Sequence, residues 1–279
     1  MFNVMINKLY FKEALMLNLE NKVAIVTGCG SEGNGWGNGR AIATTLSRQG
    51  AKVIGTDLNI AHANNTKKYI INEGNYCETF EIDMVVESEV HRFFQEVVNK
   101  YSTIDILVNN VGRSEPGDPE IMSLETWHEQ FNVNIDAAFL CIKHTLPIMK
   151  KNNSGSIINI SSVAGLRYIG KPQVAYSASK AALIQMTKTT AVIHAKDNVR
   201  LNCVVPGLMH TPLVERLAKK YADGKYEEFV KHRHNQVPMK KMGDAFDVAN
   251  AVLFLSSDEA KYITGTEIIV DGGLTSVTP

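Results

Sequence analysis

Short apolar runs alternate along the chain with longer segments in which apolar residues recur at helical spacing. The runs are short and apolar and are bounded by Gly, Asn, Asp or Pro, which predicts buried strands at 23–27, 52–56, 104–109, 156–161, 201–205 and 267–270. Residues 76–82, which alternate only in part, predict a weaker strand. The spacing between these runs predicts helices at 40–49, 60–73, 87–100, 123–150, 175–196 and 244–256. Such an order of elements implies parallel strands joined by right-handed crossovers.

This order predicts an α/β fold: a single doubly wound, Rossmann-type domain over residues 16–279, with a parallel sheet of about seven strands and helices on both faces. Residues 208–242 interrupt the alternation, because they are helical in pattern, highly charged and without a strand. An insertion that follows a parallel strand lies where such sheets bind ligands, so we expect a lid there. We expect residues 1–15 to be a poorly ordered N-terminal extension.

The composition narrows the function classes. The 279 residues are 44% hydrophobic and 21% charged, and 29 basic residues balance 29 acidic ones. This balance argues against a protein that grips nucleic acid, and no apolar run approaches the roughly 20 residues that span a bilayer. The four cysteines are far apart, which favours isolated buried thiols over a disulfide framework or a metal site. We therefore expect a cytoplasmic protein without a metal, a nucleic-acid partner or a membrane anchor.

A glycine-rich loop follows the first predicted strand, with six glycines from Gly28 to Gly39. Backbone amides of such a loop approach a pyrophosphate closely, and the following helix adds partial positive charge at its N-terminus. The string from Gly28 to Gly33 matches the dinucleotide fingerprint, but Gly33 lies too early, because the helical pattern starts only after Gly39. Gly37 and Gly39 are better placed to hold the cofactor.

The second strand is followed by Asp57, about thirty residues after the start of the loop. A carboxylate there accepts hydrogen bonds from the adenosine ribose diol and repels a 2′-phosphate, so the cofactor is predicted to be NAD. Leu58, the next residue, is uncharged and cannot pair with the 2′-phosphate of NADP. Arg40, which follows the last glycine of the loop, is the residue that leaves NADP open.

Tyr176 and Lys180 lie four residues apart on one face of a predicted helix. A nearby ammonium stabilises a phenolate, so we expect Lys180 to lower the pKa of Tyr176 and make it a general acid/base near neutral pH. Ser162 follows a predicted strand fourteen residues before Tyr176, where its hydroxyl points into the same crevice as the glycine loop.

Together these motifs resemble the short-chain dehydrogenase/reductase family over nearly everything from Leu19 to Leu274. The motifs that carry the resemblance are, in chain order, Thr27-Gly28 with Gly37-x-Gly39, Asp83, Asn109-Asn110-Val111-Gly112, Asn134, Ser162, Tyr176 with Lys180, Pro206-Gly207 with Thr211, and Asp271-Gly272-Gly273.

The resemblance implies four catalytic residues. Tyr176 would exchange a proton with the substrate oxygen, which Ser162 would orient. Lys180 would hold the nicotinamide ribose, and Asn134 would position a water that links Lys180 to solvent. The cofactor site implied in the same way comprises Gly28, Gly37, Asn38, Gly39, Asp57, Asp83, Asn110, Gly112, Tyr176, Lys180, Pro206, Gly207 and Thr211.

The chain departs from the family pattern in its glycine loop. Eight residues stand between Gly28 and Gly37, which is five more than the resemblance leads us to expect. Trp36, at the end of this insertion, is expected either to cap the site or to pack against the lid.

Several other residues are candidates for substrate contact. Arg113, Arg167, Tyr168 and His210 follow motif residues closely in sequence, and an acidic substrate would explain the two arginines and the histidine. Residues 231–235 are instead expected to be a solvated charged face, because no carboxylate or cysteine lies at ligand spacing.

We therefore predict an NAD-dependent oxidoreductase that interconverts a secondary alcohol and a ketone, or an aldehyde, as a homotetramer or homodimer. Two alternatives stay open. One is an NADP-dependent 3-oxoacyl carbonyl reductase, against which Asp57 speaks. The other is a dinucleotide-binding redox sensor without turnover, which would not need Ser162, Tyr176 and Lys180. The association surface is expected on helices 123–150 and 175–195. Its apolar residues would include Ala137, Ala138, Leu183 and Met186, which fit a core face equally well.

Overall fold

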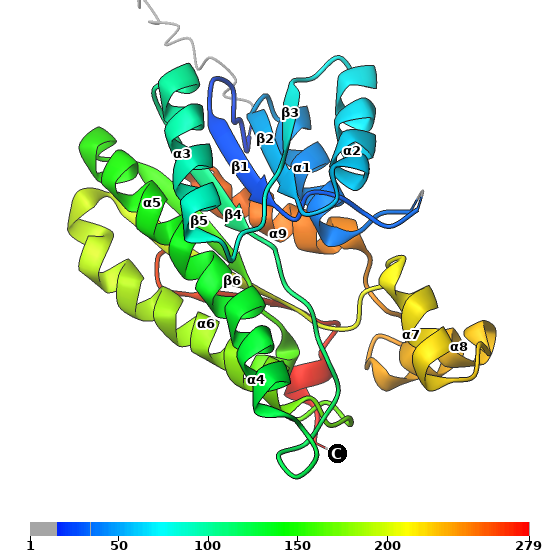
Figure 1. The fold of residues 1–279 in the computed structure, drawn as a ribbon. Helices are drawn as coiled ribbons and strands as arrows, with labels where there is room; N and C mark the ends of the chain where they lie inside the picture. The colour runs from blue at the N-terminus through cyan, green and yellow to red at the C-terminus, as the bar shows by residue number, and fades with distance from the viewer. Residues whose placement is uncertain (1–15, 34, 279) are drawn as a thin grey trace, which may run out of the picture.

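The computed structural model describes residues 16–33 and 35–278, which form a seven-stranded parallel sheet with helices on both sides (Figure 1). The strands lie in the order β3-β2-β1-β4-β5-β6-β7. Their bounds are β1 Val23–Thr27, β2 Lys52–Asp57, β3 Cys77–Glu81, β4 Ile106–Asn109, β5 Gly155–Ile160, β6 Val199–Pro206 and β7 Glu267–Val270. The longer helices are α1 Asn38–Arg48, α2 Ile60–Asn72, α3 Glu87–Tyr101, α4 Leu124–Phe131, α5 Ala137–Asn152, α6 Val174–His194, α7 Leu213–Tyr221, α8 Tyr226–Gln236 and α9 Ala245–Ser256. The prediction of a doubly wound α/β sheet is confirmed.

The strand order reverses between β1 and β4, and this reversal fixes where a ligand can bind. From β1 the chain moves outward through β2 to β3 and then returns to β4 on the other side of β1. The connections after β1 and after β4 therefore leave in opposite directions and open a crevice at the carboxyl ends of these strands. The loops that follow Thr27 and Asn109 border that crevice.

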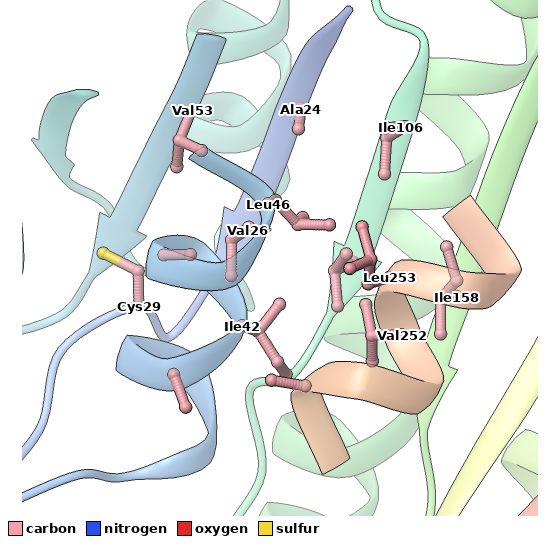
Figure 2. Packing of buried hydrophobic residues seen from close by; sticks show 14 of the residues in the cluster. Ala24, Val26, Cys29, Ile42, Leu46, Val53, Ile106, Ile158, Val252 and Leu253 are labelled. Carbon is pink, nitrogen blue, oxygen red and sulfur yellow. The ribbon is translucent and has the colours of Figure 1, made fainter. Parts of the chain in front are cut away.

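Alternate residues of the strands supply two cores, one on each face of the sheet. On the first face, Ala24 and Val26 of β1 pack with Ile42 and Leu46 of α1 and with Val252 of α9 (Figure 2). Val23 and Ile25 point to the second face, which is covered by α3 and α5 and by the end of α6. Burial on both faces explains why the strands read as continuous apolar runs.

The prediction of one continuous helix at 123–150 is wrong, because the structure divides this segment into two α-helices. A π-helical segment, Asn132–Asp136, separates α4 from α5. The π turn adds a residue to the helical repeat, and such bulges occur frequently at functional sites. The first helix also begins at Asn38 rather than at residue 40, because Gly37 has extended backbone and serves as its N-cap.

Residues 208–242 fold as α7 and α8, which lie at one side of the sheet (Figure 1). We call this region the α7–α8 segment. Its predicted helical character is confirmed, and it contains no strand of the sheet. The extension expected at residues 1–15 lies outside the described residues. Within the part of the chain that the structure describes, no helix is both long and apolar enough to cross a membrane.

Candidate active site

The start of α1 and the end of β1 approach each other so closely that only glycine fits between them. A Cβ on Gly39 would lie 1.9 Å from the carbonyl oxygen of Gly28. The first turn of α1 carries no acidic residue, and the buried Oδ1 atom of Asn38 has no hydrogen-bond partner among the described residues. The helix N-terminus therefore presents free amides and partial positive charge, which suits a phosphate group.

Arg40 organises the long glycine loop from inside the protein. Its side chain is fully buried, and its Nη1 atom donates to the carbonyl of Gly35 at 2.6 Å. Its Nη2 atom donates to the carbonyls of Ser31 at 3.2 Å and Gly33 at 3.3 Å. The guanidinium is thus committed to the loop backbone, so Arg40 is not available as a partner for the 2′-phosphate of NADP.

Trp36 does not line the cleft, and the ring contacts found for it among the described residues are with α2 and α9 rather than with the α7–α8 segment. Its ring lies 5.3 Å from that of Tyr69 in α2 and 4.8 Å from that of Phe246 in α9. The insertion is therefore anchored by Trp36 on the outer side of α1 and by Arg40 underneath.

Asp57 also supports the loop. Its Oδ2 atom accepts a 2.9 Å hydrogen bond from the amide of Gly30, and its Oδ1 atom accepts one of 3.0 Å from Asn59. These bonds fix the carboxylate at the end of β2, beside the loop. Asp83, two residues after the end of β3, accepts a hydrogen bond from the amide of Val85.

The loop after β4 is tied to the glycine loop by Asn110. Its side-chain amide donates to the carbonyls of Gly28 at 2.9 Å and Thr27 at 3.3 Å. The Thr27 hydroxyl in turn accepts from the backbone amides of Asn110 and Val111. The two edges of the crevice are therefore fixed relative to each other.

Tyr176, Ser162 and Lys180 meet on the other side of the crevice, where α6 passes the end of β5. Lys180 is 3% exposed, and its Nζ atom donates to the carbonyl of Ile160 at 2.9 Å and lies 5.8 Å from the centre of the Tyr176 ring. Ser162 lies two residues after the end of β5, and its Oγ atom accepts from the amide of Ala164.

Asn134, in the π-helical segment, lies behind this group. Its side chain exchanges two hydrogen bonds of 3.0 Å with the backbone of Arg113. A Cβ on Gly112 would lie 2.8 Å from the Oδ1 atom of Asn134 and 3.0 Å from the Nζ atom of Lys180. Gly112 therefore allows the amide of Asn134 and the amine of Lys180 to approach the same point.

Burial controls the ionisation of this group. It lowers the pKa of Lys180 to about 8 and raises the pKa of Tyr176, while hydrogen bonding with Ser162 opposes the rise for Tyr176. The expectation that Lys180 lowers the pKa of Tyr176 is wrong for this arrangement, because the ammonium is directed at the carbonyl of Ile160 and not at the phenol.

One cleft of about 360 Å³ joins the two halves of the site. Most of the predicted site residues line it: Gly28, Gly37, Asn38, Gly39, Asn110, Gly112, Ser162, Tyr176, Lys180, Pro206, Gly207 and Thr211. Asp57, Asp83 and Asn134 do not line the cleft. Asp57 and Asn134 instead contact residues that line it. Asp57 accepts a hydrogen bond from Gly30, and Asn134 lies close to Gly112 and Lys180.

The cationic residues proposed for substrate contact have other partners. Arg113 pairs with Glu129, Arg167 donates to backbone carbonyls of residues 274–277, and His210 bonds to the hydroxyl of Tyr226. None of the three lines the cleft.

Two arginines of the α7–α8 segment line the cleft instead, and the sequence interpretation missed both. Arg216 of α7 forms a 2.8 Å ion pair with Glu32 of the glycine loop. Arg233 of α8 lies in the run expected to be solvated. That expectation holds for Lys231 and His232 and is wrong for Arg233 and His234, which are half-buried. The one feature of the sequence that could have indicated their burial is the pair of apolar residues Phe229 and Val230, which stands just before the charged run.

The cysteines match their expected role. All four thiols are free and buried, and burial raises the pKa of each of them. No group of three or more potential ligands for a metal ion occurs in the described ranges 16–33 and 35–278.

Comparison with known proteins agrees with this geometry. A family model described as enoyl-(acyl carrier protein) reductase matches residues 33–275. The chain is 34% identical over 258 residues to the 3-oxoacyl-[acyl-carrier-protein] reductase FabG of Thermotoga maritima, covering 92% of this chain and 99% of that protein. It is 36% identical over 255 residues to the 2,5-dichloro-2,5-cyclohexadiene-1,4-diol dehydrogenase LinX of Sphingobium indicum, covering 91% and 96%.

A solved structure extends the similarity to three dimensions. A protein from Burkholderia xenovorans, assigned to the short-chain dehydrogenases/reductases, superposes with a TM-score of 0.90 at 43% identity, covering 94% of this chain and 99% of that one. The chain therefore belongs to the short-chain dehydrogenase/reductase family, whose members are oxidoreductases that bind a nicotinamide dinucleotide.

Proposed function

We propose that this protein is an NAD(H)-dependent oxidoreductase that interconverts a secondary alcohol and a ketone, or an aldehyde, with Tyr176 as the general acid/base. The observation that carries the proposal is that Ser162, Tyr176 and Lys180 line the same cleft as the glycine loop. A proton donor and a dinucleotide cradle on opposite walls of one cleft suit hydride transfer to or from a carbonyl carbon.

The residues present fit a dinucleotide. The close approach at Gly39 and the absence of acidic residues from the first turn of α1 suit a pyrophosphate, together with Gly28, Gly37 and Asn38. Asp57 would hold the adenosine ribose. Asp83, which lies after β3 and outside the cleft lining, is proposed for the adenine. Asn110, Gly112, Pro206, Gly207 and Thr211, which line the cleft, are the other residues proposed for the adenine and the nicotinamide. When bound, the dinucleotide supplies or accepts the hydride.

In the direction of reduction, the phenol of Tyr176 donates its proton to the carbonyl oxygen, which the hydroxyl of Ser162 holds by a second hydrogen bond. The raised pKa of Tyr176 keeps this proton in place until the substrate oxygen gains charge. Lys180, whose ammonium is directed at the carbonyl of Ile160, would hold the nicotinamide ribose. Asn134, beside Lys180, positions the water that returns the proton from solvent.

NAD is proposed over NADP because of the carboxylate of Asp57. It is fixed beside the loop by the amide of Gly30 and would repel a 2′-phosphate. Arg40, the residue that left NADP open, is committed to the loop carbonyls and supports the same choice.

A 3-oxoacyl reductase is the second candidate, because FabG of Thermotoga maritima is among the relatives. The dissociation constants of NADH and NADPH separate the two candidates, since tighter binding of NADPH would favour the 3-oxoacyl reductase. A redox sensor without turnover is the third, and it needs none of the proton-transfer residues.

Tyr176→Phe tests the proposal. We expect the variant to bind NADH as the wild type does, measured by the fluorescence of the reduced cofactor, and to lose oxidation of a panel of secondary alcohols followed by absorbance. Wild-type protein that binds NADH but turns over none of the alcohols or ketones would favour the sensor. Turnover by the Tyr176→Phe variant would remove Tyr176 as the general acid/base.

We further propose that residues 16–279 form one catalytic domain, that the α7–α8 segment is the lid over a small-molecule substrate, and that the protein is a homotetramer or homodimer. The residues expected at the association surface require a correction, because Ala137, Ala138 and Leu183 are buried in the core. The exposed apolar residues of α5 and α6 are Phe139, Val192 and Ile193, and they are the surface we propose.

A further inference from the structure

Arg233 is a cation of the candidate active site that has no carboxylate partner among the described residues. It projects from α8 and lines the cleft that contains Tyr176 and Ser162. Arg216, the other cation that the α7–α8 segment brings to this cleft, is paired with Glu32 at the glycine loop. No carboxylate among the described residues lies within ion-pair distance of Arg233.

The guanidinium of Arg233 is held in place by apolar and sulfur contacts. It lies over the ring of Phe229, 5.5 Å from the ring centre, and its Nε atom approaches the sulfur of Met242 at 3.4 Å. Among the described residues, none accepts a hydrogen bond from its Nη1 or Nη2 atom. The planar end of the side chain, which matches the two oxygens of a carboxylate, is therefore free to bind a ligand.

Contacts made by His234 and Tyr226 fix the position of α8 beside the cleft. The amide of Met242 donates to the Nδ1 atom of His234 at 2.8 Å, and the His234 ring stacks on that of His210. His210 in turn bonds to Tyr226 at the start of α8. This packing holds Arg233 in a half-buried position, where a lone positive charge is costly unless an anion joins it.

Arg233 lines the same cleft as the proton-transfer residues Tyr176 and Ser162. Lys171 belongs to the loop that leads from Ser162 to Tyr176, and it is close enough for the charge of Arg233 to lower its pKa further, beyond the larger effect of burial. Arg216 is paired with Glu32 beside the glycine loop, where the pyrophosphate would bind. Arg233 is therefore the arginine of this segment that is available to a different part of the ligand.

We infer that Arg233 binds a carboxylate of the substrate, so that the enzyme acts on hydroxy acids and oxo acids rather than on neutral alcohols and ketones. This inference rests on the proposed function, because it names the substrate class of the same site. The apolar residues Met209, Leu213 and Leu217 also line the cleft and would cover the carbon chain between the carboxylate and the reacting oxygen.

Matched acids and esters test the inference. Pyruvate, acetoacetate and levulinate are compared with their methyl esters, which keep the ketone and remove the charge. We expect at least one acid to bind about tenfold or more tightly than its ester by calorimetry, and to show the same preference in kcat/KM with NADH. Equal affinity for acid and ester in all three pairs, or no binding by any of the acids, would overturn the inference.

Variants of α8 assign the preference to Arg233. Arg233→Met should abolish the preference for the acid, and Arg233→Lys should restore part of it, since lysine keeps the charge but not the two parallel hydrogen bonds. Lys231→Met removes an exposed cation from the same helix and should leave the preference unchanged. A preference that survives in Arg233→Met, or an equal loss in Lys231→Met, would contradict the role of Arg233.

Two further outcomes separate the inference from its alternatives. One would show that Arg233 binds the cofactor, and the other would show that the protein binds an acid without reducing it. If Arg233→Met weakens NADH binding and leaves the ratio of acid to ester unchanged, the guanidinium serves the cofactor pyrophosphate and the inference is wrong. If the wild type binds an acid more tightly than its ester but reduces neither, the carboxylate site stands and the proposed hydride transfer fails.

Discussion

Arg216 of α7 and Glu32 of the glycine loop form an ion pair of 2.8 Å across the mouth of the cleft. The pair connects the proposed lid to the five-residue insertion, and the proximity of Gly35 to Pro212 reinforces the connection. Both charged side chains are more than half exposed, so the pair contributes at most about 1 kcal/mol.

Glu32→Gln should therefore speed NADH dissociation by up to about fivefold, because the loop and the lid separate more easily. Stopped-flow fluorescence measures this rate, and the difference should disappear at about 1 M salt, where exposed charges are screened. The matched control is Glu87→Gln, which breaks an exposed pair with Lys143 outside the cleft. An equal change in both variants would show that the Glu32 pair has no special connection to the cofactor.

Arg40→Met should destabilise the protein by about 2–4 kcal/mol, because it leaves three loop carbonyls without their donor inside the protein. NADH affinity should fall more than tenfold, since the glycine loop that lines the cleft loses its support. Denaturant unfolding and NADH titration measure the two effects.

Arg48→Met is the matched control for Arg40→Met. Arg48 lies on the same helix, but its guanidinium is exposed and pairs with Glu73. We expect its loss to change the free energy of unfolding by less than about 1 kcal/mol and NADH affinity not at all. Normal stability and cofactor binding in Arg40→Met would mean that the loop keeps its shape without the guanidinium.

Asp57→Asn tests the choice of cofactor. The change removes the negative charge at the end of β2 and one of the two backbone hydrogen bonds of the carboxylate. The ratio of the dissociation constants of NADPH and NADH should fall about tenfold, because a 2′-phosphate is no longer repelled. Glu81→Gln, on the neighbouring strand opposite Asp57, is the control for a general loss of negative charge. Wild-type protein that already prefers NADPH would contradict the assignment.

The buried Lys180 makes the free energy of unfolding depend on pH. Because burial lowers its pKa to about 8 in the folded protein, the unfolded chain binds more protons between pH 8 and the ordinary pKa of lysine. The penalty for burying the ammonium is therefore full below pH 8 and disappears as the pH rises toward 10.5. Relative to Lys180→Met, the wild type should gain up to about 3 kcal/mol over this interval. Denaturant unfolding of both proteins at several pH values measures the difference, and a constant difference would mean that Lys180 has an ordinary pKa.

The sheet could be predicted from the sequence because most of its strands are short apolar runs that end at a turn residue. The exception is β3, which carries two glutamates and gave only a partial alternation. The crevice followed from the same logic, since Thr27 and Asn109 end strands that are neighbours in a doubly wound sheet. Residues next to strand ends, such as Ser162 and Gly112, could therefore be placed from chain order alone.

The rest of the site depends on side-chain directions that chain order does not determine. Arg40 lies one residue after Gly39, and only the path of the inserted loop turns its guanidinium inward. Arg233 belongs to a run of charged residues whose average polarity indicates solvent, and the packing of His234 against Met242 is what brings it to the cleft. The π turn at Asn134 leaves no mark in the pattern of apolar residues.

The burial of Arg40 beneath the inserted loop has a consequence for protein engineering. Shortening the loop to the length usual in the family would remove the carbonyl groups that now surround the guanidinium and strand a positive charge inside the protein. A deletion variant would thus have to replace Arg40 at the same time, and a graft of the loop onto a shorter relative would have to carry an arginine with it. The insertion and the arginine therefore form one structural unit, in which each depends on the other.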